Sequence, residues 1–321
     1  VLSGIQPSGQ LHLGNYAGAI RQFLDMQHDH EMFIFVASFH ALTSVRDPDQ
    51  LRDNTRQAVI DHIAFGLDPD RDNVALYRQQ DVPQVTELTW LLSCVCPKSF
   101  MDKQVAYKEK VDRGLQATIG LYSYPILQAA DILGVDPDLV PVGLDQKQNL
   151  EIARDLAGRF NEAFGEVFKV PEARFRTGSG TLPGVDGQKM SKSYGNTIDP
   201  FLPEKKLRKT VMKIVTDSKG VEEEKDPDTC TVFQIFRAIA GEDDQRTSDL
   251  AEQYRAGGMG YGHAKQALFE LSLDHFGDAR AKREELMKDP AQIDAVLQRG
   301  AEKASAVIGD VTQRARRACG L

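Results

Sequence analysis

Apolar and polar residues follow two different patterns along the chain, and the pattern changes near residue 200. Short apolar runs typical of buried strands occur in the first half of the chain, and segments with helical spacing of apolar residues separate them. We predict strands at residues 1–5, 32–37, 74–79 and 139–142. We predict helices over residues 14–26 and 48–66, over the segment LTWLLSCVC, and over a segment from Leu150 to Phe160. Strands and helices in this order indicate an α/β unit with a parallel sheet.

Beyond about residue 200 the apolar spacing is helical only. It recurs in four segments, LRKTVMKIV, CTVFQIFRAIA, AKQALFELSL and AQIDAVLQRGAEKASAVI. Gly195-Asn196 and Asp199-Pro200 are typical chain breaks just before this change. We therefore predict a Rossmann-like, doubly wound α/β domain over residues 1–198 and a C-terminal α-helical domain over residues 199–321.

The composition is that of a soluble globular protein, with 41% hydrophobic and 27% charged residues among 321. Because no run of 18 apolar residues is present, we expect no membrane span and a cytoplasmic location. The first residue is Val1 rather than Met, so we expect the encoded start to lie upstream. Four scattered cysteines do not form a disulfide framework, and Cys94 and Cys96 have no His cluster nearby. We expect reduced thiols and no metal bound by the protein.

The net charge of −8 argues against a protein that coats DNA or other nucleic acid without specificity, although a local basic face is compatible with it. Basic residues gather at Lys205, Lys206, Arg208, Lys209 and Lys213, and again at Arg314, Arg316 and Arg317. They are candidate phosphate contacts. A solvated helix face, balanced by the acidic run 222–224, is the alternative interpretation.

A candidate phosphate-binding segment follows the first predicted strand. It reads Pro-Ser-Gly-Gln-Leu-His-Leu-Gly-Asn-Tyr from residue 7 to residue 16. In open α/β sheets, ligands bind where a strand ends and a helix begins. His12 and Asn15 offer donors to a phosphate, and Gly14 leaves backbone against which a flat base can lie. Helix capping is the alternative role for these residues.

A second candidate segment is Lys-Met-Ser-Lys-Ser at residues 189–193. It follows a glycine-rich stretch, so we expect a loop that can move. Two ammonium groups on such a loop suit a leaving pyrophosphate, whose negative charge grows in the transition state. A given pentapeptide occurs by chance in a chain of this length on the order of once in ten thousand sequences. The two segments together predict ATP binding and activation of a carboxylic acid.

Together the two segments resemble the signature motifs of class I aminoacyl-tRNA synthetases. His12-Leu13-Gly14-Asn15 is similar to their first motif, with Asn in place of the final His, and residues 189–193 match their second. The opening SGIQPSGQLHLGNYAGAIRQF is similar to tryptophanyl-tRNA synthetases. So are YPILQAADIL at 124–133, VPVGLDQKQNLEIARDLAGRFN at 140–161, KMSKSYGNTI at 189–198, VTDS at 215–218 and GAEKA at 300–304. The resemblance covers nearly the whole chain.

This resemblance implies that ATP, accompanied by Mg²⁺, lies between the two motifs. Tryptophan is then converted to its adenylate, and the acyl group is transferred to tRNA(Trp). The implied catalytic residues are Lys192, Lys189, Lys110, His12 and Asn15. The implied ATP-binding residues are Gln6, Ser8, His12, Gly14, Asn15, Gly143, Asp145, Lys189, Met190, Ser191, Lys192 and Ser193.

The resemblance also implies a tryptophan pocket made by Asp131, Tyr124, Gln128, Gln146, His40 and Gln6. Asp131 is the candidate reader of the side chain, because a buried carboxylate can accept the indole N–H. A helix cap or structural ion pair is its alternative role. Five positions depart from many bacterial tryptophan enzymes, namely Ser38, Phe39, Gln128, Leu144 and Leu2. They bear on the polarity of the pocket.

Two other functions are compatible with the same residues. A tyrosyl-tRNA synthetase is one, since an aspartate accepts a hydrogen bond from a phenol as readily as from an indole. A non-catalytic synthetase paralogue that serves as a binding or regulatory protein is the other. The resemblance further implies a homodimer and a helical domain that binds the tRNA anticodon region.

Overall fold

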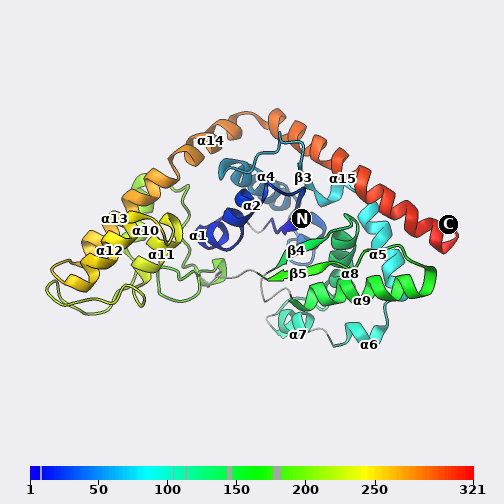
Figure 1. Ribbon diagram of the computed structural model, residues 1–321, viewed down its shortest axis with the longest axis horizontal. Helices are drawn as coiled ribbons and strands as arrows, with labels where there is room; N and C mark the ends of the chain where they lie inside the picture. The colour runs from blue at the N-terminus through cyan, green and yellow to red at the C-terminus, as the bar shows by residue number, and fades with distance from the viewer. Residues whose placement is uncertain (8, 104, 113, 143–146, 176–181) are drawn as a thin grey trace.

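The computed structural model describes residues 1–321 except 8, 104, 113, 143–146 and 176–181. Three parallel strands form a sheet in the order β1 (Leu2–Ile5), β2 (Met32–Val36) and β3 (Val74–Arg78). A second parallel pair, β4 (Leu139–Val142) with β5 (Glu172–Phe175), lies beside β1 (Figure 1). The strand order in space is therefore β3-β2-β1-β4-β5. This order reverses direction at β1, as in doubly wound α/β folds, so the predicted fold class is confirmed.

All four predicted strands are present, within a residue or two at their ends. The fifth strand, β5, was not predicted. Its sequence, Glu-Ala-Arg-Phe, contains only two apolar residues in alternation with charged ones, so it forms no apolar run. A strand this short has too little pattern to be separated from a loop.

Helices cover both faces of the sheet. On one face lie α2 (Arg21–Met26) and α4 (Pro48–Ala64), and on the other lie α5 (Gln84–Val95), α8 (Ile119–Leu133) and α9 (Lys147–Phe164). The Asp47 carboxylate caps α4 by accepting from the backbone N–H groups of Asp49 and Gln50, as the Asp-Pro sequence predicts. Three short helices complete this half: α3 (Ser38–Ala41), α6 (Lys98–Met101) and α7 (Val105–Asp112).

The predicted helix over residues 14–26 is present but is not uniform. It starts as α1 (Leu13–Asn15), passes through a π-helical turn, η1 (Tyr16–Ile20), and continues as α2. Single π turns are rare and occur frequently at functional sites. This turn directly follows the candidate phosphate residues His12 and Asn15.

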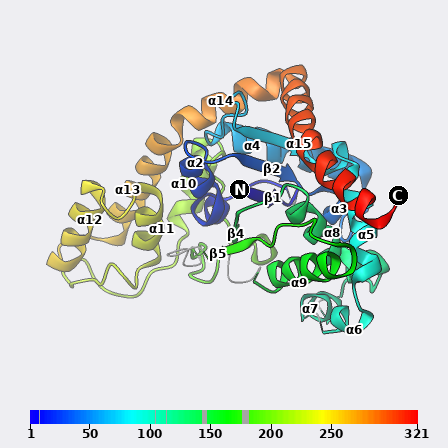
Figure 2. The same cartoon turned by 45° about the vertical axis from the view of Figure 1, so that its right-hand side comes forward.

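Residues beyond 200 are helical, as predicted. They form α10 (Glu204–Met212), α11 (Thr231–Ala240), α12 (Gln245–Ala256), α13 (Tyr261–His275), α14 (Gly277–Lys288) and α15 (Pro290–Cys319). Four of them, α10 to α13, pack on one another as a group that we call the helical unit. The division at residues 198 and 199 remains a prediction, because α14 leaves this unit to pack on α4, and α15 returns to β3 and α5 (Figure 2).

Gly300 explains how α15 approaches the edge of the sheet so closely. A Cβ atom at this position would lie 2.0 Å from the Leu76 carbonyl oxygen of β3, so only glycine fits. Helix α15 thereby covers the edge strand β3, whose backbone groups would otherwise be open to pairing with another chain.

One hydrophobic cluster joins the two halves of the molecule. It contains Leu11, Leu13, Tyr16 and Ile20 from the first motif, together with buried residues of the helical unit such as Phe236. The helical segment that begins at the candidate phosphate site is therefore packed against the helical unit.

No helix among the described residues is long and apolar enough to cross a membrane.

Candidate active site

The two candidate phosphate motifs meet in space. The Leu13 N–H donates to the Ile198 carbonyl at 2.9 Å, and the Gly14 N–H donates to the Met190 Sδ at 3.3 Å. The Lys192 Nζ donates to the Gly9 carbonyl at 3.0 Å. All three contacts lie at the carboxyl end of β1, where the strand order reverses and where ligands of doubly wound sheets bind.

His12 is a buried, neutral donor at the start of α1. Its side chain is 7% exposed, and its backbone N–H donates to the Asn15 Oδ1 at 3.1 Å. Burial, and then the nearby charge of Lys192, lowers the pKa of His12 to about 4. The ring is therefore neutral at pH 7 and keeps one N–H donor. Among the described residues nothing hydrogen-bonds its Nδ1 atom, so this buried atom suits a polar ligand.

Gly14 leaves room that the site requires. A Cβ atom at this position would lie 3.0 Å from two ring atoms of His12 and 3.5 Å from the Cβ of Met190. Any other residue would press on the His12 ring from the side of the second motif. The glycine therefore leaves the space that the His12 ring occupies.

Asn196 holds the second motif in place through side-chain hydrogen bonds. The Asn196 side chain accepts from the Ser191 N–H at 2.8 Å and donates to the Lys189 carbonyl at 3.0 Å and to Asp186 at 2.7 Å. The motif ends in a short 3₁₀ helix, η4 (Lys192–Tyr194). Asn196 was not among the predicted site residues, although its position three residues after the motif was a usable signal.

Lys192 is an exposed residue whose ammonium group contacts the Gly9 carbonyl. Burial lowers the pKa of its ammonium group, and the carboxylates of Asp61 and Asp199 act in the opposite direction. Lys189, Lys192 and Ser193 are exposed, and Ser191 is half-buried. Lys192 is thus the lysine of this motif whose ammonium group contacts the segment that holds the first motif.

The predicted pocket residue Asp131 lies in a separate buried cluster. It is 2% exposed, and its carboxylate accepts from His40 Nε2 at 3.0 Å and from Gln79 Nε2 at 2.8 and 3.0 Å. Burial raises the pKa of Asp131, while the hydrogen bonds from His40 and Gln79 lower it. Tyr124 packs edge-on against His40, with ring centroids 6.1 Å apart. The structure therefore brings His40, Asp131 and Tyr124 together.

Gln79 belongs to this cluster and was missed. It is fully buried just after β3, where its Nε2 binds both oxygens of Asp131 and its Oε1 accepts from the Phe39 N–H at 3.0 Å. A polar residue at the carboxyl end of a buried strand was the available signal. Among the described residues Gln79 and His40 make three contacts with Asp131, and a carboxylate offers about four acceptor positions.

Two of the remaining predicted residues lie in the described part of the chain. Gln6 is exposed just after β1, and Gln128 is half-buried on α8. Ser8, Gly143, Asp145 and Gln146 lie outside the described residues, as does the side chain of Lys110 on α7. His40 and Tyr124 also line a cavity of about 480 Å³ between α3, α5 and α8. Within the described part of the chain, no three His, Cys, Asp or Glu side chains form a group that could hold a metal ion.

Comparison with known protein families gives a match that covers most of the chain. The family model described as tRNA synthetases class I (W and Y) matches residues 1–277. Tryptophan–tRNA ligase of Rhodopirellula baltica is 51% identical over all of this chain and 99% of its own length. The corresponding protein of Fusobacterium nucleatum is 46% identical over all of this chain and 97% of its own length.

Solved structures agree with this match. Tryptophanyl-tRNA synthetase of Campylobacter jejuni, complexed with ADP and tryptophan, superposes with a TM-score of 0.92 at 43% identity, over all of this chain and 99% of that one. The tryptophanyl-tRNA synthetase of Mycoplasma pneumoniae gives a TM-score of 0.83 at 28% identity, over all of this chain and 97% of that one. The chain therefore belongs to the class I tRNA synthetases, in the family of the tryptophan and tyrosine enzymes and among its tryptophanyl-tRNA synthetases.

Proposed function

We propose that this protein uses ATP to activate L-tryptophan as tryptophanyl-adenylate and then transfers the tryptophanyl group to tRNA(Trp). The observation that carries this proposal is the meeting of two motifs far apart in sequence, recorded in the hydrogen bond from Lys192 to the Gly9 carbonyl. It places donors and an ammonium group around one point at the carboxyl end of β1. The relatives named tryptophan–tRNA ligase, which match over their whole length, support the choice of amino acid.

In this proposal ATP lies between His12, Asn15 and Lys192. The tryptophan carboxylate attacks the α-phosphorus, the bond from the α-phosphorus to the bridging oxygen breaks, and pyrophosphate leaves. Charge grows on the leaving group, so the Lys192 ammonium stabilises the transition state more than the ground state. The side chains act by positioning and electrostatics rather than as nucleophiles. Lys189 and Lys110 assist as further cations in the same proposal.

Magnesium enters this reaction as part of the substrate. Mg²⁺ prefers phosphate oxygens and water and keeps octahedral geometry, so it is carried by the phosphates of ATP. Its charge would offset part of the charge on the leaving pyrophosphate. The residues near the phosphates are donors and cations, which fits a metal bound by the nucleotide rather than by protein carboxylates.

Asp131 is the residue that we propose to recognise the indole. An indole N–H is a donor only, and the Asp131 carboxylate retains an acceptor position beside its contacts with His40 and Gln79. Those two residues fix the direction of the carboxylate. A site built to pair with a donor rejects side chains that lack one, because the buried acceptor would be left unpaired.

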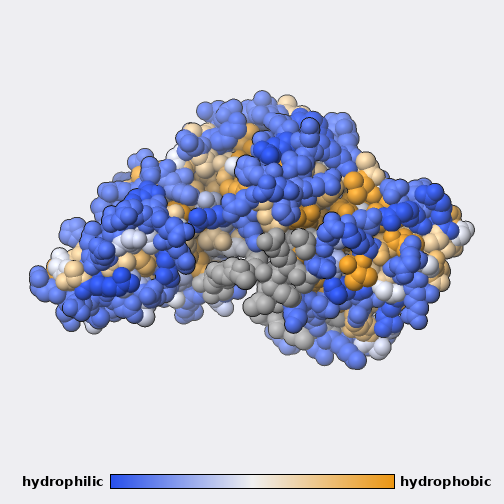
Figure 3. Space-filling view, viewed as in Figure 1, coloured by the Kyte–Doolittle hydropathy of each residue, from blue (hydrophilic) through white to orange (hydrophobic). Residues whose placement is uncertain are grey.

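We also propose that the helical unit binds the anticodon region of tRNA, that the protein is a homodimer, and that it works in the cytoplasm. Three large apolar side chains near α3, α5 and α8 support the dimer: Leu42 is 47% exposed, Trp90 70% and Ile119 80%. Figure 3 shows apolar patches on the half of the molecule that holds α5 and α8. Exposed apolar patches on a protein surface are typical of interfaces.

One experiment tests the amino acid and the activity together. The purified protein is assayed for ATP–pyrophosphate exchange with each of the twenty amino acids. We expect exchange with tryptophan and little with tyrosine. Faster exchange with tyrosine would indicate a tyrosyl enzyme, and no exchange with any amino acid would indicate a non-catalytic paralogue.

Binding of tRNA should weaken steeply as salt rises, because phosphate contacts release counterions.

A further inference from the structure

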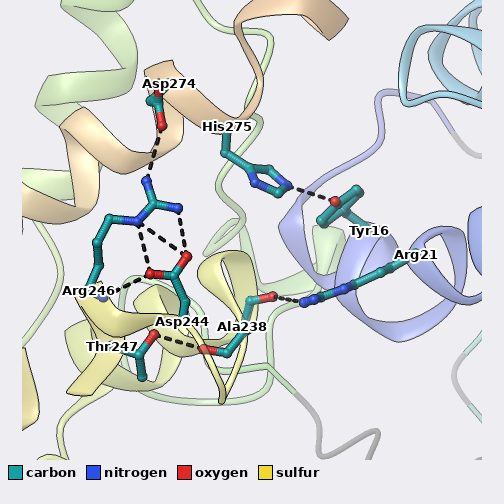
Figure 4. Close-up of polar contacts among 9 residues, drawn as sticks. Tyr16, Arg21, Ala238, Asp244, Arg246, Thr247, Asp274 and His275 are labelled. Carbon is teal, nitrogen blue, oxygen red and sulfur yellow. Dashed lines mark hydrogen bonds and ion pairs between the residues drawn. The ribbon is translucent and has the colours of Figure 1, made fainter.

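Tyr16 joins the ATP motif to the end of α13 in the helical unit. It directly follows Asn15 and opens the π-helical turn η1. Its hydroxyl lies 2.8 Å from the Nε2 of His275 and shares a hydrogen bond with it, although the two residues are 259 positions apart in sequence. His275 is the last residue of α13. Figure 4 shows the tyrosine pointing from its own helical segment directly at the imidazole.

The ring of Tyr16 is fixed independently of this hydrogen bond. It is 7% exposed, with the Phe65 ring centroid at 5.2 Å and the Phe276 ring centroid at 4.9 Å. Phe65 ends α4, and Phe276 follows His275. Packing of this kind is retained when the hydroxyl is removed, so the hydroxyl can be tested alone.

A second contact joins the same two parts of the molecule. Arg21 lies five residues beyond Tyr16. Its guanidinium donates to the Ala238 carbonyl on α11 at 3.3 Å (Figure 4). Gly241 follows α11 and has a φ of +110°. A Cβ atom added to Gly241 would lie 3.3 Å from the Arg21 guanidinium. The helical segment is therefore held at two points on one side.

On the helical unit, the residues around His275 are themselves tied together. Arg246, on α12, pairs with Asp244 at 2.8 Å and with Asp274 at 3.1 Å. Asp274 precedes His275 on α13, so this group links the start of α12 to the end of α13 (Figure 4). A displacement of the helical unit would thus move His275 with it rather than leave it behind.

We propose that the Tyr16–His275 hydrogen bond is a positioning link, which sets the orientation of Asn15 at the ATP site according to the placement of the helical unit. Neither residue is catalytic in this proposal. Asn15 and Tyr16 are neighbours on a short helical segment, so a rotation imposed at Tyr16 is passed to Asn15. The proposal rests on the proposed function, since the helical unit is where we place tRNA.

The test uses Tyr16→Phe, His275→Ala and the double variant in ATP–pyrophosphate exchange. We expect each single variant to lower kcat/KM for ATP about three- to tenfold, the range of one hydrogen bond, with the KM for tryptophan within twofold of the wild type. The double variant should be no worse than the poorer single variant, because one shared bond can be lost only once. The matched control is Thr247→Val, which removes a 2.8 Å hydrogen bond to Gly241 inside the helical unit.

The control separates positioning from stability. Thr247→Val should lower Tm about as much as Tyr16→Phe does and leave kcat/KM for ATP unchanged. The link would be overturned if the losses of kcat/KM for ATP in the two single variants multiplied in the double variant. It would also be overturned if Tyr16→Phe kept the wild-type kcat/KM. ATP affinity by calorimetry gives a readout without turnover. An inactive wild type would refute the proposed function, while unchanged ATP affinity in Tyr16→Phe would still count against the link.

Discussion

The ammonium group of Lys192 donates to the backbone carbonyl of Gly9 at 3.0 Å, from a point 183 residues further along the chain. The second motif is thereby placed over the turn that follows β1. In the proposed mechanism ATP binds there, and the ammonium exchanges this neutral acceptor for phosphate oxygens, which form shorter and stronger hydrogen bonds with it. The Gly9 carbonyl would then keep the lysine close to where the proposed leaving group forms.

Substitution of Lys192 by Ala should slow tryptophan activation by at least ~10²-fold, as expected when a transition-state donor is removed. The rate of ATP–pyrophosphate exchange measures this directly. Lys205→Ala, which removes an exposed lysine of α10, is the control and should keep the wild-type rate. Exchange by Lys192→Ala within threefold of wild type would refute the role given to this lysine.

Asp131→Asn should raise the KM for tryptophan roughly 10- to 100-fold and leave the KM for ATP within twofold. A hydrogen bond to a charged group contributes about 1.5–3 kcal/mol, and the amide would also face the Gln79 donor. Steady-state exchange at varied tryptophan and varied ATP separates the two constants. Asp138→Asn, on the exposed turn before β4, is the matched surface control. An unchanged KM for tryptophan would show that Asp131 has a structural role only.

Gly300→Ala should destabilise the protein by about 3 kcal/mol or more, because the new Cβ would overlap the Leu76 carbonyl and push α15 from β3. Gly309→Ala is a control in the same helix, since the nearest atom to its added Cβ is 4.0 Å away. It should stabilise by roughly 0.5–1 kcal/mol through helix propensity. Urea unfolding of both variants gives the comparison, and equal stabilities would contradict the close approach.

Stability should fall as the pH drops from 6.5 to 4, partly because of His62. This buried residue has its pKa lowered to about 4 by burial, so the unfolded chain binds a proton that the folded chain does not. The free energy of unfolding then declines by about 1.4 kcal/mol per pH unit across that window, and is unaffected above it. His12, with a pKa also lowered to about 4, adds a similar decline.

Urea unfolding of His62→Gln at pH 8 and at pH 5 isolates this contribution. The advantage of the wild type over the variant should shrink by about 2 kcal/mol at the lower pH. His263→Gln, which removes an exposed imidazole, is the matched control. A wild-type advantage that is equal at both pH values would show that His62 takes up its proton in the folded state.

Trp90→Asp should convert the proposed dimer to a monomer in sedimentation velocity, because it introduces a charge into an apolar contact. Val221→Asp, a substitution of an exposed valine in the loop between α10 and α11, should leave the dimer intact. A monomeric wild type, or a dimeric Trp90→Asp variant, would show that the apolar side chains near α5 serve another purpose.

Local structure was largely predictable from the sequence, since strands such as residues 32–37 and the cap at Asp47 depend on nearby residues alone. Both phosphate motifs were also found, because their residue types and spacing are specific. What could not be predicted was pairing across the chain. A helical pattern shows that α15 has a buried face but not that the face covers β3. Gln79 lies beside Asp131 only because their two elements come together in the fold.

The position of α15 has a consequence for synthesis on the ribosome. The edge of β3 is covered by residues near the carboxyl terminus, so it stays open while the intervening two hundred or so residues are being added. An unpaired strand edge in a partly made chain is a site for aggregation. The sheet of the half that is translated first is therefore fully enclosed only after α15 has been made and has packed on β3.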